Sequence, residues 1–169
     1  MSVKTRLLET LGRKESLIEQ HAREHKLVIY GGRAVQAQGG FLARQTSDYD
    51  LSTAHPKREA GHLTSIFNRE SAGRFFYQTP SKKHKGTEKV RFVGFDFKRG
   101  TKDDFTIADV SKTRPLKTVN IQGIRYARLS ETAKDKAESL KDENFEFRHG
   151  KDREDLQRIN AIQKVERLF

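Results

Sequence analysis

Residues 27–53 read LVIYGGRAVQAQGGFLARQTSDYDLST, and this stretch decides the fold. Residues 27–30 form a short apolar run that ends in Gly31-Gly32, a pattern typical of a buried strand closed by a tight turn. Residues 33–38 then predict the first turns of a helix. Glycines at such a turn let the backbone approach a ligand, and the N–H groups of a helix start attract phosphate. An ordinary strand-to-helix turn is the alternative interpretation.

The same stretch predicts a second strand that carries two aspartates. Residues 47–52, SDYDLS, alternate, so a strand here points Asp48 and Asp50 to one face and Tyr49 and Leu51 to the other. Two carboxylates this close repel each other unless a divalent cation lies between them, and Mg²⁺ prefers carboxylate oxygens together with substrate phosphates. The layout indicates a site for a nucleoside triphosphate (NTP) and two Mg²⁺ ions. A solvated edge-strand face or a turn is the alternative.

The spacing of the two motifs resembles the signature of the nucleotidyltransferase superfamily, which has the DNA polymerase beta-like fold. Here fifteen residues separate Gly31-Gly32 from Asp48-Tyr49-Asp50-Leu51. Residues 44–51, RQTSDYDL, are most similar to the AbiEii-like branch, found among type IV toxins. The spacer is about two residues longer than that branch usually shows, so we expect the loop from Gly39 to Thr46 to differ in shape.

The resemblance implies an α+β fold with a small mixed β-sheet backed by helices and with C-terminal helices. It also implies roles for single residues. Arg44 is either a phosphate contact or a surface charge. The residues expected at the site are Asp48 and Asp50 as catalytic metal ligands, Gly31 and Gly32 around the phosphates, and Arg33, Arg44 and Lys136 as nucleotide-binding cations.

The superfamily also implies a third carboxylate on a neighbouring strand. Residues 89–97, KVRFVGFDF, and 104–112, DFTIADVSK, predict two strands joined by the charged turn 98–103, a plausible hairpin. We prefer Asp109 as the third catalytic and metal-binding carboxylate, because it ends an apolar line on the second strand. Asp96 is the substitute if the strand order differs. A strand-end aspartate that faces water is the alternative for either residue.

The downstream half, residues 121–159, is similar to the AbiEii-like pattern of a short strand, a helix with a lysine, an arginine and a Lys-Asp-x-x-Asp helix. Ser130 is a reasonable N-cap for the first helix. Lys136 falls on the apolar face of that helix, so it either reaches the triphosphate or packs its stem while its ammonium extends to water. Four polar residues begin the last helix and either orient the site or pair with one another: Arg148, Lys151, Asp152 and Asp155.

Length and composition favour a single domain over residues 1–169, and the resemblance implies a nucleotidyltransferase-like domain with a core at about 25–112 and helices at about 130–169. The chain has no cysteine, which excludes disulfides, a thiolate metal site and a cysteine nucleophile. No apolar run is long enough to cross a bilayer, and the first residues lack the apolar stretch of a secretory signal. We therefore expect a cytoplasmic protein that does not contact a membrane.

The net charge is +11 and the sequence pI is about 9.9, which favours a phosphate-rich partner. Part of the excess lies between residues 81 and 102, where basic side chains are interleaved with Phe92, Phe95 and Phe97. Such a pattern can bind single-stranded RNA by charge and stacking, and a solvated hairpin is the alternative. The basic residues are Lys82, Lys83, Lys85, Lys89, Arg91, Lys98, Arg99 and Lys102.

The residues and the resemblance together predict an enzyme that moves a nucleoside monophosphate from an NTP to an acceptor hydroxyl with release of pyrophosphate. The charge favours an RNA acceptor such as a tRNA 3′ end, although similar cores also modify antibiotics and proteins. The AbiEii-like resemblance implies a toxin–antitoxin or phage-defence setting, and hence an antitoxin or other protein partner. A catalytically inactive basic module for RNA binding or assembly is the alternative.

Overall fold

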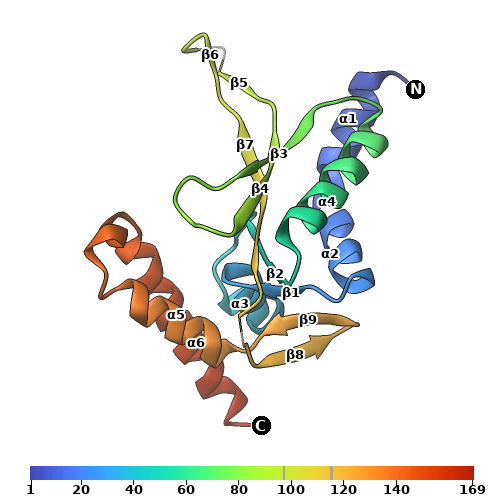
Figure 1. Ribbon diagram of the computed structural model, residues 1–169. Helices are drawn as coiled ribbons and strands as arrows, with labels where there is room; N and C mark the ends of the chain where they lie inside the picture. The colour runs from blue at the N-terminus through green and yellow to red at the C-terminus, as the bar shows by residue number, and fades with distance from the viewer. Residues whose placement is uncertain (97, 115) are drawn as a thin grey trace. The chain divides into compact units, whose positions relative to one another are not determined.

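A computed structural model describes residues 1–96, 98–114 and 116–169, which form two compact units (Figure 1). The first unit comprises Met1–Leu27 and Asp50–Arg114, and the second comprises Val28–Tyr49 and Pro115–Phe169. Each unit combines helices with β-strands, so the predicted α+β class is confirmed. None of the helices in the described residues has the length and apolar character needed to cross a membrane.

In the first unit, four strands pair in the order β3-β4-β7-β2. β3 and β4 are antiparallel, and so are β4 and β7, which confirms the predicted hairpin. The short pair β5 and β6 lies between β4 and β7 in the chain. The strands are β2 (Tyr49–Thr53), β3 (Phe76–Pro80), β4 (Thr87–Phe92), β5 (Phe95–Asp96), β6 (Thr101–Lys102) and β7 (Phe105–Lys112).

Three helices complete the first unit: α1 (Val3–Gly12), α2 (Lys14–Glu24) and α4 (Pro56–Ser71). Proline in the first turn of α4 suits a position where the backbone N–H has no helical partner. Leu63 and Phe67, four residues apart on that helix, are fully buried, and the Phe67 ring stacks on Phe76 of β3 at 4.8 Å between centroids. The apolar stripe of α4 therefore packs against the strands.

The second unit has a small mixed sheet of order β1-β9-β8, in which β1 and β9 are parallel and β9 and β8 antiparallel. The β8–β9 turn has positive φ at Gln122 (52°) and Gly123 (81°), the backbone of a tight hairpin. The elements are β1 (Val28–Tyr30), α3 (Gly32–Gly39), η1 (Gly40–Leu42), β8 (Thr118–Ile121), β9 (Ile124–Ala127), α5 (Leu129–Ser139), η2 (Glu143–Arg148) and α6 (His149–Glu166).

The core of the second unit joins α3, α5 and α6. A Cβ on Gly39 would lie 2.2 Å from Cδ1 of Ile162, so only glycine permits this approach of α6 to the end of α3. Helix α5 begins at Leu129 with Arg128 as N-cap, so the prediction of Ser130 as N-cap was wrong. Leu129 is buried, and its burial places the helix start in the core. The core residues are Val35, Ala43, Leu129, Ile159 and Ile162.

We expect Ile159→Ala to lower the free energy of unfolding by about 2–5 kcal/mol, because it leaves a cavity at a side chain that is 0% exposed. Val165→Ala on the same helix is the matched control, since Val165 is 42% exposed, and should change stability by less than about 0.5 kcal/mol. Urea denaturation measures both. Equal losses in the two variants would contradict this assignment of the core.

Candidate active site

The Gly31-Gly32 turn has the shape that the sequence predicts. Gly31 is the N-cap of α3 with φ 67° and ψ −147°, a backbone conformation that residues other than glycine rarely adopt. A Cβ on Gly32 would lie 3.0 Å from Cγ2 of Thr46 and 3.6 Å from Nη2 of Arg44. Strand β1, the turn and α3 thus form the strand–glycine–helix unit whose first N–H groups lack helical partners. Such a turn suits an anion.

Arg33, the first side chain after the turn, packs on an aromatic ring. Its guanidinium carbon lies 4.4 Å from the centroid of the Tyr49 ring, and Arg33 is only 7% exposed. Tyr49 stands between the two predicted catalytic aspartates and is itself 1% exposed. The cation–π contact therefore anchors the start of β2 to α3. Nucleotide binding by Arg33 stays a prediction.

Asp48 and Asp50 flank this buried tyrosine. Asp48 is exposed and lies just before β2, and Asp50 is half-buried within the strand. Tyr49 and Leu51 are buried, so the predicted alternation is present, although the strand begins at Tyr49 and not at Ser47. The polar side of this segment therefore presents carboxylate oxygens, the donor type that a hard cation requires.

Asp109, the preferred third carboxylate, lies on β7, the strand next to β2 in the first unit. It stands opposite Lys89 of β4, and the Lys89 ammonium lies 2.9 and 3.3 Å from its two carboxylate oxygens. Asp109 is half-buried. The side chain of the substitute, Asp96, and the whole of Phe97 lie outside the described residues.

A buried network of charges connects α5 and α6 of the second unit. Lys136 donates to Oδ1 of Asp152 at 2.8 Å and lies 3.1 Å from Oδ2 of Asp155. Ser139 donates to the other oxygen of Asp152 at 2.7 Å. Nε of Arg44 donates to Oδ1 of Asp155 at 2.9 Å. Lys136 is 6% exposed, so its ammonium does not extend to water. The second of the two predicted alternatives is therefore wrong.

Hydrogen bonds keep both aspartates of this network ionised. Burial alone raises the pKa of Asp152, but the hydrogen bonds from Lys136 and Ser139 outweigh it and leave the pKa below 3.8. Burial also raises the pKa of Asp155, and Arg44 and Lys136 together lower it below its usual value. Two cations therefore offset two anions, which removes most of the cost of burying each charge.

The network also fixes a side chain beside the glycine turn. Arg44 contacts Asp155 through Nε, and its Nη2 lies next to the position that a Cβ on Gly32 would occupy. Asp155 is in turn held by Lys136. Arg44 is thus a predicted cation whose guanidinium lies beside Gly32. Asp152 and Asp155 of α6 thus pair with Lys136 and Arg44, which lie outside that helix, whereas one predicted alternative was that the polar residues of the helix pair with one another.

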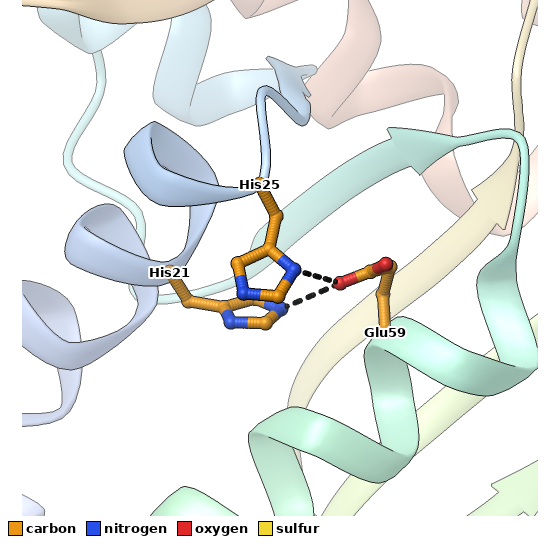
Figure 2. Close-up of side chains that lie close together, drawn as sticks. All are labelled: His21, His25 and Glu59. Atoms are coloured by element: carbon orange, nitrogen blue, oxygen red, sulfur yellow. Dashed lines mark ion pairs between the residues drawn. The ribbon is translucent and has the colours of Figure 1, made fainter.

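A second cluster of polar side chains, in the first unit, was not among the predicted sites. His21, His25 and Glu59 converge from α2, its C-cap and α4 (Figure 2). Burial and the neighbouring His25 lower the pKa of His21 to about 4, so His21 is neutral at pH 7. The signal in the sequence was the spacing, because residues three or four apart lie on one face of a helix: His21 and His25 are four residues apart, and Glu59 and His62 are three apart.

The chain shares its fold with a polyadenylate synthase. The chain superposes on the Megavirus polyadenylate synthase with a TM-score of 0.70 and 16% identity, over 95% of this chain and 34% of that one. JHP933 from Helicobacter pylori matches with a TM-score of 0.50 and 15% identity, over 82% of this chain and 59% of that one. This chain therefore spans about a third of the Megavirus protein.

A nucleotidyltransferase-like protein from Paracoccidioides brasiliensis is similar over 85% of this chain and 72% of its own, with 18% identity and a TM-score of 0.49. No protein-family model matches the sequence. The curated proteins contain no match either. The similarity therefore defines the fold, and the AbiEii-like branch stays a prediction.

We expect Lys136→Met to destabilise the protein by about 3–5 kcal/mol, because it leaves Asp152 and Asp155 buried without their shared cation. Lys134→Met on the same helix is the control: Lys134 is exposed, and its loss should cost less than about 0.5 kcal/mol. Thermal and urea unfolding measure the difference. A Lys136→Met variant as stable as the control would show that the network contributes nothing.

The network also predicts a pH dependence of stability. Burial raises the pKa of Asp155, but Arg44 and Lys136 hold it below its usual value in the folded state, so unfolding takes up a proton at acid pH and stability falls as pH drops below about 5. Asp155→Asn cannot titrate, so the stability gap between the wild type and this variant should narrow from pH 7 to pH 3. Urea unfolding at each pH measures the gap. A gap independent of pH would contradict the ion pair.

Proposed function

We propose that this protein is a metal-dependent nucleotidyltransferase that transfers a nucleoside monophosphate from an NTP to an acceptor hydroxyl and releases pyrophosphate. One observation carries the proposal. In the segment around β2, Tyr49 and Leu51 are buried, whereas Asp48 and Asp50 are not, and the fold is shared with a polyadenylate synthase. Burial of Tyr49 and Leu51 fixes the apolar side of the segment, and Asp48 and Asp50 alternate with them along the chain. A purely structural strand gains nothing from carboxylates two residues apart.

The donor set fits Mg²⁺. Asp48 and Asp50 offer hard carboxylate oxygens at partly or fully exposed positions, and Mg²⁺ retains waters and shares its ligands with substrate phosphates. Asp109 is the third proposed ligand, and binding there requires Lys89 to exchange its partner. When bound, two Mg²⁺ ions would neutralise triphosphate charge and lower the pKa of the attacking hydroxyl.

The cations of the chain complete the proposal. Backbone N–H groups at Gly31 and Gly32 bind the phosphates, and Arg44, oriented by Asp155, neutralises charge on the departing pyrophosphate. Arg33 is proposed for the same task from its place directly after the glycine turn. Lys136 contributes positive potential and holds Asp155 in place. Asp109 accepts the proton of the attacking hydroxyl.

We propose RNA, such as a tRNA 3′ end, as the acceptor. The net charge of +11 favours a polyanion, and the Megavirus protein is by name a polyadenylate synthase. Lys89 and Arg91 make contacts within the first unit, to Asp109 and to the backbone of Asp104. The exposed cations of this segment, which we propose contact RNA, are Lys82, Lys83, Lys85, Lys98, Arg99 and Lys102. The AbiEii-like assignment adds a toxin setting with an antitoxin partner.

We expect Asp48→Asn and Asp50→Asn each to reduce nucleotide transfer by roughly a thousandfold or more, since each removes an anionic metal ligand. Asp103→Asn, an equal change at an exposed aspartate, should keep full activity. The assay supplies Mg²⁺, each α-labelled NTP in turn, and total cellular RNA and protein. Label on RNA or on a polypeptide identifies the acceptor class. Full activity in Asp48→Asn would contradict the proposal.

One observation favours a second function. The Lys89–Asp109 pair occupies the third carboxylate with a lysine of the same hairpin, as expected for a site that no longer binds metal. The alternative is an inactive, basic RNA-binding or assembly module. Such a module would bind RNA with steep salt dependence, and neither Mg²⁺ nor NTP would affect it. RNA binding that the Asp48→Asn, Asp50→Asn double variant retains, with no transfer from any NTP, would establish it.

A further inference from the structure

Two histidines and one glutamate meet at a point between α2 and α4 of the first unit (Figure 2). Nε2 of His21 lies 3.1 Å from Oε2 of Glu59, and Nδ1 of His25 lies 2.9 Å from the same oxygen. The side chains of His21 and Glu59 are 1% exposed, whereas that of His25 is 33% exposed. The cluster is therefore buried on one side and open to water on the other.

The contacts are close but are not aligned as hydrogen bonds. Neither ring nitrogen of His21 nor Oε2 of Glu59 has a hydrogen-bond partner of acceptable geometry among the described residues, despite the 3.1 Å separation. Unsatisfied buried polar atoms cost about 1–3 kcal/mol each, so a fold retains them when a ligand satisfies them. The unsatisfied atoms of His21 and Glu59, together with the partly exposed Nδ1 of His25, converge on one point as the ligand set of a metal ion does.

The spacing of the donor atoms fits a small dication. Zinc bonds of about 2.0–2.1 Å to nitrogen and oxygen in tetrahedral geometry place neighbouring ligand atoms roughly 3.3 Å apart. All three donor atoms of the cluster lie within 4.8 Å of one another. Two imidazoles with one carboxylate suit Zn²⁺ and its first-row neighbours, while Mg²⁺ and Ca²⁺ prefer oxygen alone.

The surroundings of the cluster supply the remaining parts of such a site. Arg58 donates to the other carboxylate oxygen of Glu59 at 2.7 and 2.9 Å, which fixes the direction of Oε2. His62, one turn along α4 and half exposed, places Nδ1 3.8 Å from that oxygen. The rings of His25 and His62 lie 5.5 Å apart between centroids. His62 therefore stands at the open side, where a fourth ligand enters.

We propose that His21, His25 and Glu59 bind one Zn²⁺ ion, with His62 or water as the fourth ligand, and that the ion ties α2 to α4. This site shares no residue with the proposed nucleotidyltransferase site. Its donor set also differs, since Asp48, Asp50 and Asp109 offer only oxygen. The zinc site is structural in this proposal: it satisfies buried atoms and links two helices that are distant in the sequence.

The test measures binding of Zn²⁺ to the full chain, purified without a polyhistidine tag and stripped with a chelator. Isothermal titration should show one equivalent of Zn²⁺, and Co²⁺ in its place should give the intense visible absorption of tetrahedral cobalt. His25→Ala, partly exposed and therefore tolerated, should weaken zinc binding by more than about a hundredfold, beyond the loss expected from an outer partner alone. His84→Ala, at an exposed histidine, is the matched control and should bind like wild type.

A thermal melt separates binding from folding. Zn²⁺ should raise the melting temperature of the wild type and of His84→Ala but not of His25→Ala, because an ion that binds only the folded state stabilises it. Circular dichroism at 25 °C should show that His25→Ala is folded without metal. Absence of one tight equivalent in the wild type, or equal zinc binding by His25→Ala and His84→Ala, would overturn the proposal.

Discussion

A lysine buried among aspartates ties together the helices of the second unit. The ammonium of Lys136 contacts Asp152 and Asp155, and Arg44 completes the charge balance from the segment before β2. Each partner alone would be costly to bury, so the four side chains are stable only as a set. The set draws α5, α6 and the loop that carries Arg44 together, and it places the Arg44 guanidinium beside Gly32.

Buried contacts also fix the segment that carries Asp48 and Asp50. Tyr49 and Leu51 are buried, and the Arg33 guanidinium stacks on the tyrosine ring. Apolar burial and a cation–π contact thus fix the backbone between Asp48 and Asp50, the two proposed metal ligands. In a fold shared with a polyadenylate synthase, this alternation of buried apolar side chains with carboxylates is the physical basis of the proposed transferase.

In the histidine cluster of the first unit, a buried carboxylate stays ionised. Glu59 is buried, yet the hydrogen bonds from Arg58 and the two nearby histidines outweigh the effect of burial and lower its pKa. The carboxylate is therefore ionised, and one of its oxygens faces two imidazole nitrogens. A basic, cysteine-free chain has histidine and carboxylate as its means of binding a transition metal, and α2 and α4 bring them together.

The sequence by itself determined the local structure. Apolar runs and glycines predicted β1, the Gly31-Gly32 turn, α3 and the β4–β7 hairpin, because period and turn chemistry act over a few residues. It also predicted the buried side of β2 and the α+β class. It misplaced the start of α5 at Ser130, since burial of Leu129 outweighs a favourable cap.

Only the tertiary structure decided which charges pair. Lys136 and Asp152 are separated by 16 residues, Arg44 and Asp155 by 111, and His21 and Glu59 come from different helices. No local pattern encodes such distances. Pairing of buried charges depends on packing of α5 on α6 and of α2 on α4, and packing is set by the whole apolar core, whereas a strand or a turn is set by its own few residues.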